Sequence, residues 1–175
     1  MSKRSISQSK RQGVRINLTQ PKPRYESEEF GPGKAGIIIC PRCEAIYYGK
    51  AWHHNRYTQR ELEDMHKKIK SSLCPACRME DGKVCEGFIV FENIPKEKKD
   101  DMIKLIEHVG ERAYKTDVLD RILKIEKKGN DVQVYTSENQ LAVKIAKQAQ
   151  RAFKGKLKIE WAHPTGPVRI FWTMN

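Results

Sequence analysis

Two Cys-x-x-Cys motifs constrain this chain more than any other feature of its sequence. They are Cys40-Pro41-Arg42-Cys43 and Cys74-Pro75-Ala76-Cys77, and thirty residues separate them. Each motif can bring two thiolates to one metal ion from a tight turn, and four thiolates complete a tetrahedral shell. The alternatives are two disulfides or two redox motifs, but a redox Cys-x-x-Cys usually occurs once, near a βαβ pattern. The pair therefore predicts one structural zinc ion, with the ligands Cys40, Cys43, Cys74 and Cys77.

The remaining cysteine and two histidines offer weaker candidates for chemistry. Cys85 is expected to be a small, half-buried residue, because no His/Asp arrangement is readable around it. His53 and His54 follow the first motif and could replace a sulfur ligand, although four cysteines already fill a zinc shell. Metal-binding cysteines fit a reducing compartment. The sequence shows no apolar run of transmembrane length and no secretory signal, so we expect a cytoplasmic protein.

The positive charge of the chain is unevenly distributed. Its net charge is +12, from 34 basic and 22 acidic residues. Residues 1 to about 24 hold seven basic and no acidic residues among Ser, Gln and Pro, which predicts a disordered basic arm (1–36). Residues 25–87 hold ten of each sign, and residues 88–175 hold 17 basic and 12 acidic residues. Such a balance favours a polyanionic partner, most often nucleic acid and less often an anionic membrane surface.

We interpret the arm as a segment that neutralises RNA phosphates and becomes ordered on binding. The alternative is a solvated tail that only aids solubility. The candidate RNA-binding residues are the basic side chains of the arm and two that lie in or beside the cysteine motifs: Lys3, Arg4, Lys10, Arg11, Arg15, Lys22, Arg24, Arg42 and Arg78.

The segment 37–87 is predicted to be a zinc ribbon with an inserted helix. Ile37-Ile38-Ile39 is a β-branched run that predicts a strand entering the first motif. Thr58-x-x-Glu61 is a capping box, and the apolar residues behind it predict a helix over 58–72, namely Leu62, Met65, Ile69 and Leu73. Three aromatic residues between these elements either stack on unpaired bases or cover a small core; they are Tyr47, Tyr48 and Trp52.

Residues 88–175 show a regular alternation of strand and helix patterns. Strands are predicted at 88–91, 122–125, 131–135, 157–161 and 168–172, with a hairpin turn at Gly129-Asn130. Apolar residues at helical spacing run from Met102 to Ala113, and a second helix is predicted from a capping box, Ser137-x-x-Gln140, to Gly155 at its C-cap. The order β-α-β-β-α-β-β predicts an α+β chain whose last domain is ferredoxin-like with an extra terminal strand.

The cysteine motifs and their surroundings resemble a known family. Cys74-Pro75-Ala76-Cys77-Arg78, then Asp81 and Gly87 before an apolar strand, are similar to prokaryotic NMD proteins, which affect ribosome stability and mRNA decay. These proteins are relatives of the N-terminal part of the eukaryotic large-subunit export adaptor. The first motif with Trp52-His53 behind it, and the segment 117–155, are also similar to this family, so that the resemblance covers roughly residues 37–172. The richness in Lys and Glu is typical of an archaeal protein.

The resemblance implies zinc, association with the ribosome or rRNA, and no catalysis. It also suggests a similarity to ribosome-silencing or hibernation factors. A factor of this type can pair two small subunits through its own homodimer. The expected partners are therefore the ribosome and rRNA, with the small subunit favoured. We expect neither a membrane nor a small-molecule substrate as partner. The alternatives are a transcription-associated zinc-ribbon protein that binds DNA or polymerase, and a metal-dependent or thiol enzyme.

Overall fold

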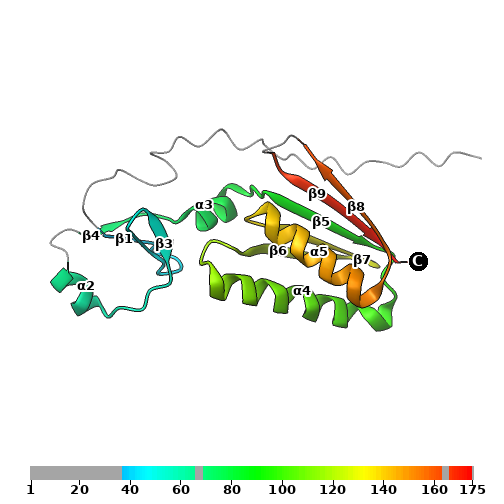
Figure 1. Ribbon diagram of the computed structural model, residues 1–175, viewed down its shortest axis with the longest axis horizontal. Helices are drawn as coiled ribbons and strands as arrows, with labels where there is room; N and C mark the ends of the chain where they lie inside the picture. The colour runs from blue at the N-terminus through cyan, green and yellow to red at the C-terminus, as the bar shows by residue number, and fades with distance from the viewer. Residues whose placement is uncertain (1–36, 66–68, 163–165, 175) are drawn as a thin grey trace, which may run out of the picture.

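The computed structural model describes residues 37–65, 69–162 and 166–174 of the 175-residue chain. The predicted arm and its basic residues, from Lys3 to Arg24, lie outside the described residues. Within them, the chain is mixed α+β and forms two mixed sheets and four helices. The N-terminal unit, β1 (Ile37–Ile39) to α3 (Pro75–Gly82), begins at one end of the long axis, and the C-terminal unit, β5 (Gly87–Glu92) to β9 (Val168–Thr173), occupies the other; α3 lies between them (Figure 1). None of the described helices is both long and apolar enough to cross a membrane.

The N-terminal unit is built on a small sheet of four short strands in the order β3-β2-β1-β4. These are β1 (Ile37–Ile39), β2 (Ile46–Tyr48), β3 (Ala51–His53) and β4 (Ile69–Ser71). The strand predicted at the isoleucine run is thus confirmed. β1 pairs antiparallel with β2 and parallel with β4. A small apolar cluster of Ile37, Ile46 and Leu62 joins this sheet to α2 (Gln59–Met65).

The helix predicted over 58–72 is correct at its start and wrong at its end. The Thr58 N–H donates to Glu61 Oε2 at 2.7 Å and the Glu61 N–H donates to Thr58 Oγ1 at 3.3 Å, which is the expected capping box. However, the described residues of α2 run only to Met65, and Ile69–Ser71 form β4. The free edge of β1 offers this segment a backbone partner, so strand pairing overrides the helical spacing. Ile69 is accordingly 38% exposed instead of packing on a helix face.

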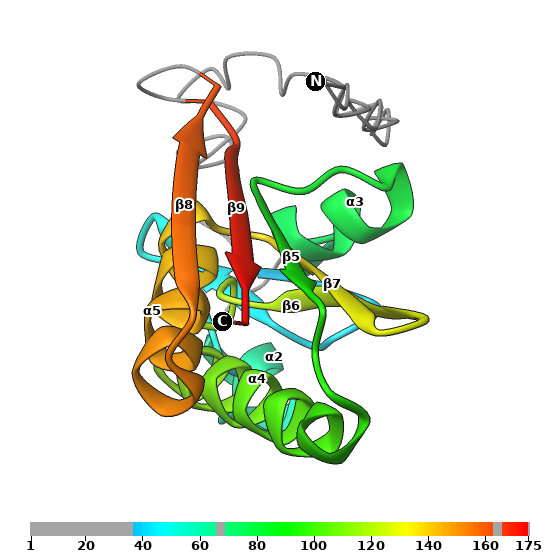
Figure 2. The same ribbon diagram turned by 90° about the vertical axis from the view of Figure 1, so that its right-hand side faces the viewer.

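The C-terminal unit has the element order predicted from its sequence. It contains β5 (Gly87–Glu92), α4 (Lys96–Thr116), β6 (Ile122–Lys128), β7 (Asp131–Thr136), α5 (Asn139–Phe153), β8 (Lys156–Trp161) and β9 (Val168–Thr173). Helices α4 and α5 pack on one face of the sheet (Figure 2). The buried core between them includes Met102, Ile106 and Val109 of α4 and Leu141 and Ile145 of α5.

The pairing of the strands differs from a ferredoxin-like sheet. The order is β6-β7-β5-β9-β8, so β9 lies between β5 and β8 and runs parallel to β5 (Figure 2). In a ferredoxin-like sheet β8, the strand after the second helix, would pair directly with β5. The extra terminal strand that the sequence predicts is therefore present, but it lies inside the sheet and not at an edge. Val168, Ile170 and Trp172 of β9 are all fully buried, which suits a central strand, whereas β8 alternates with exposed lysines and forms the edge.

Both ends of α5 differ slightly from their prediction. Its N-cap is Glu138, with no side-chain capping bond, so the capping box predicted at Ser137 is wrong. The Ser137 hydroxyl instead donates to the Leu119 carbonyl at 2.6 Å and accepts the Arg121 N–H at 2.8 Å. Ser137 therefore joins the start of β6 to the end of β7. At the other end the C-cap is Lys154, and Gly155 follows it with a φ of +102°.

Candidate metal centre

The two cysteine motifs reach one point from two kinds of local structure. Cys40 and Cys43 lie in the turn between β1 and β2, where the Cys40 N–H donates to the Ala45 carbonyl at 2.8 Å. Cys74 is the N-cap of α3 (Pro75–Gly82), and its sulfur accepts the Cys77 N–H at 3.4 Å. Proline at the first helical position suits this start, because its missing N–H would have no helical partner. The second motif thus opens a helix, unlike a ribbon in which both motifs lie in hairpins.

The four sulfur atoms have the spacing that a single metal ion needs. They all lie within 4.8 Å of one another, and Cys43 Sγ is 3.7 Å from Cys74 Sγ. A tetrahedral ion with metal–sulfur bonds of about 2.3 Å separates its sulfurs by about 3.8 Å. All five cysteines of the chain are free thiols, so the alternative of two disulfides does not describe this structure. The cluster could therefore hold one metal ion.

The four thiols of the cluster can all be ionised together only beside a positive charge. Burial raises the pKa of Cys74 and of Cys77. Burial acts in the same direction on Cys40, but backbone N–H groups around the two motifs outweigh it and lower its pKa to about 6. Four thiolates this close repel one another, so the fully ionised set needs a positive charge at its centre.

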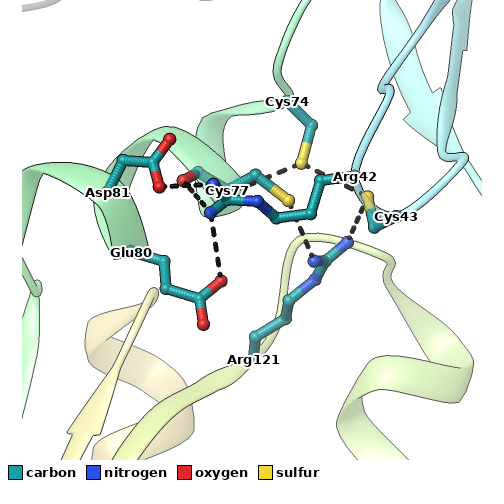
Figure 3. A network of polar contacts seen from close by, with 7 residues as sticks. All are labelled: Arg42, Cys43, Cys74, Cys77, Glu80, Asp81 and Arg121. Carbon is teal, nitrogen blue, oxygen red and sulfur yellow. Dashed lines mark hydrogen bonds and ion pairs between the residues drawn. The ribbon is translucent and has the colours of Figure 1, made fainter.

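Arg121 connects the cysteine cluster to the C-terminal unit (Figure 3). Its guanidinium donates to Cys43 Sγ at 3.0 Å and to Cys77 Sγ at 3.4 Å. The same side chain donates through Nε to the Val118 carbonyl at 2.8 Å and lies over the ring of Tyr114, 5.1 Å from its centroid. The nearby thiols raise the pKa of Arg121 against the opposing effect of burial, so its positive charge is retained.

Sequence reasoning missed Arg121 because no local pattern marks it. It lies 78 residues after Cys43 and 44 after Cys77, immediately before a strand. Four thiolates with a divalent ion carry a net charge of −2, and a guanidinium that donates to two sulfurs offsets part of this charge. Arg121 thus has the position and chemistry of an outer-shell partner of a metal–thiolate centre.

The two described candidates for RNA contact have different surroundings. The Arg42 guanidinium pairs with the Asp81 carboxylate, lies 3.6 Å from a Glu80 oxygen and donates to the Cys77 carbonyl at 3.3 Å (Figure 3). Its hydrogen bonds therefore join the first motif to α3. Arg78, on the same helix, is exposed. The arm residues that complete the predicted set lie outside the described residues.

Neither histidine behind the first motif joins the metal cluster. His54 Nε2 lies 2.6 Å from the Tyr114 carbonyl oxygen of α4, and the His53 ring stacks on Tyr48 with centroids 4.1 Å apart. Within the described residues, the cluster consists of cysteines only. Cys85 is buried more fully than predicted, and burial raises its pKa to about 11, which makes it an inert thiol at neutral pH.

The three aromatic residues divide between core and surface. Tyr47 is buried and packs against the half-buried Trp52, with ring centroids 5.5 Å apart. Trp52 also packs against the apolar cluster formed around Cys40, Cys74 and Cys77. Tyr48 is 37% exposed, so it contributes to the surface. The core interpretation thus describes Tyr47 and Trp52, and base stacking remains a prediction for Tyr48.

Comparison with known proteins found neither a matching family model nor a matching curated protein.

Proposed function

We propose that this protein is a non-enzymatic, zinc-dependent RNA-binding factor that acts on the ribosome. The observation that carries this proposal is the four-sulfur centre, whose ligands come from both motifs and whose sulfurs are joined by Arg121 to the C-terminal unit. Zinc is the metal most often bound by four cysteine thiolates in tetrahedral geometry, with iron–sulfur clusters as the other class.

A structural role for zinc agrees with the donor set. Catalytic zinc sites usually have three protein ligands and keep one position open for water or substrate. Here the four sulfurs would fill all four positions of a tetrahedral ion, and three of the four cysteines are fully buried. The apolar clusters of the N-terminal unit are small, and one of them is formed around the cysteines themselves, so metal binding would supply much of its folding free energy.

RNA is the partner that the charge distribution supports. Basic residues exceed acidic ones by seven in residues 1–24 and by five in residues 88–175. A rigid metal centre between two positively charged segments is an arrangement suited to a long polyanion. The ribosome is proposed because of the resemblance to ribosome-associated NMD proteins. The regulatory outcome, whether storage of ribosomes or pairing of subunits through a homodimer, is part of the same proposal.

Sedimentation of the tagged protein through a sucrose gradient at moderate salt tests the proposal. We expect one zinc per chain by elemental analysis, and we expect the protein in rRNA-containing fractions, with more in the small-subunit fraction. Crosslinking should enrich rRNA over DNA. A protein that stays at the top of the gradient, or that enriches DNA instead, would show that the ribosomal assignment is wrong.

A matched pair of variants tests the role of the metal. Cys74→Ser removes one buried ligand, and we expect it to lose zinc and rRNA association together. Cys85→Ser changes a buried cysteine outside the cluster and should keep its zinc. If the Cys74→Ser protein bound rRNA as well as the unaltered chain, the zinc dependence would be refuted.

A further inference from the structure

A cleft of about 550 Å³ lies where the N-terminal unit meets the C-terminal end of α4. Its walls come from β2, β3, the loop after β3, the last turn of α4 and the residues that follow it. Pockets of this size accept small molecules or single nucleotides. The cleft is separate from the sulfur cluster, because none of the four cysteines lines it.

Aromatic rings dominate one wall of this cleft. Tyr48 and Tyr57 are 37% and 36% exposed, so part of each ring faces solvent. The Tyr48 ring stacks on His53 at a centroid distance of 4.1 Å and meets Tyr57 edge to face at 6.5 Å. Trp52 lines the same cleft. Flat rings grouped at a surface in this way provide faces on which a nucleobase can stack.

Two basic side chains lie beside these rings. Arg56 belongs to the loop after β3, and Lys115 belongs to the last turn of α4; both line the cleft and are exposed. The acidic residue of the lining, Asp117, accepts the Leu119 N–H at 2.8 Å with one carboxylate oxygen. Stacking rings next to phosphate-binding cations are the combination by which proteins hold unpaired nucleotides.

We propose that this cleft binds an unpaired nucleotide of single-stranded RNA, with its base stacked on one of the two perpendicular tyrosine rings, Tyr48 and Tyr57, and edge-on to the other, and with its phosphate held by Arg56 and Lys115. The proposal rests on the proposed RNA-binding function and gives it a location. Because the base is held by stacking, the site tolerates different bases. A duplex keeps its bases inside, so it cannot use the rings.

Fluorescence anisotropy with the full-length, zinc-loaded protein tests the cleft. The probes are a fluorescein-labelled RNA of twelve uridines and a twelve-base-pair RNA duplex. Tyr48→Ala and Tyr57→Ala are each expected to weaken binding of the single strand roughly tenfold, because stacking on one aromatic side chain contributes about that factor. Duplex binding should change less than twofold. Trp161→Ala is the matched control, since Trp161 is 47% exposed on the other sheet.

The salt dependence of binding gives a second readout for the basic residues, and a loss of folding would not produce the same change in slope. Lys115→Gln should lower the slope of log affinity against log salt by about 0.7, the value for one phosphate contact on a single strand. Lys96→Gln is the control, because Lys96 is exposed at the opposite end of the same helix. This pair keeps the test decisive even if a tyrosine variant loses zinc.

The outcomes separate the two proposals. If the unaltered protein binds neither probe, the proposed RNA-binding function is wrong and the cleft proposal falls with it. If the protein binds RNA, but the tyrosine and lysine variants match Trp161→Ala and Lys96→Gln, the cleft proposal alone is overturned. Equal losses for single-stranded and duplex probes would also overturn it.

Discussion

Arg121→Met is the substitution that most directly tests how the metal centre is held. The change keeps a side chain of similar length and removes two N–H donors from Cys43 Sγ and Cys77 Sγ. It also removes a cation that lies over the Tyr114 ring. If the thiolates bind zinc, the centre then keeps its negative charge without an offsetting partner on this side.

The expected loss follows from these contacts. A hydrogen bond to a charged group contributes about 1.5–3 kcal/mol, and the two bonds have lengths of 3.0 and 3.4 Å, so the second is the weaker. Water can partly replace the donor at the half-buried Cys43. Loss of an outer-shell partner typically lowers metal affinity about 10–100-fold. This range corresponds to about 1.4–2.8 kcal/mol and agrees with one strong and one weak bond.

The assay is a zinc competition titration against a chromophoric chelator at pH 7.5, with the full chain. Arg121→Lys should give an intermediate affinity, because it keeps the charge and loses the forked geometry. Arg112→Met is the control, since Arg112 is an exposed arginine on the preceding helix. A folded Arg121→Met protein with zinc affinity within twofold of the unaltered chain would refute the reasoning. Equal losses for both variants would assign the effect to net charge alone.

Three further outcomes are expected. Gly87→Ala should lower the free energy of unfolding by about 1–3 kcal/mol in a urea titration, because its added Cβ would lie 2.5 Å from Ala142 Cβ. Gly82→Ala is the control and should be close to neutral, because the atom nearest to its added Cβ would be 3.6 Å away. Removal of the metal with a chelator should expose the amides of β1 to α3 to hydrogen exchange and leave those of β5 to β9 protected, because the larger core lies wholly within the C-terminal unit; uniform loss of protection would contradict this. The free energy of unfolding should fall from about pH 9 to 11, because burial raises the pKa of Cys85 to about 11 and that of Tyr135 to about 12. The unfolded chain therefore releases these protons at lower pH than the folded protein. Cys85→Ala should flatten the fall in urea midpoint between pH 8 and 10.5, and an unchanged profile would exclude Cys85 as its cause.

The features predictable from the sequence are those that local patterns determine. The spacing of the cysteine motifs identified a set of side chains that do meet in space. Period-two and helical spacing identified the elements of the C-terminal unit in their correct order. The capping box at Thr58 was also predicted correctly, because its two residues are neighbours on one turn.

The features that sequence patterns missed depend on contacts between distant segments. Ile69 fits a helical pattern, but its segment pairs with β1, 32 residues earlier. Similarly, the alternating patterns of β8 and β9 do not predict which of the two strands pairs with β5. The structure pairs β5 with β9, whose Trp172 is fully buried. Ser137 fits a capping box but bonds to the start of β6. At Ile69 and Ser137 a long-range partner competes with a local one and prevails.

The end of α4 is the place where these long-range contacts converge. Tyr114 lies beneath the Arg121 guanidinium, and its carbonyl oxygen is 2.6 Å from His54. Lys115, the next residue, lines the cleft. The β1–β2 turn and β2 together carry Cys43, a ligand of the proposed metal, and Tyr48, a ring of the proposed nucleotide site. Loss of the metal would therefore release the strand that presents Tyr48. A ligand that binds only the folded unit stabilises it in turn, so zinc and single-stranded RNA should each strengthen the binding of the other.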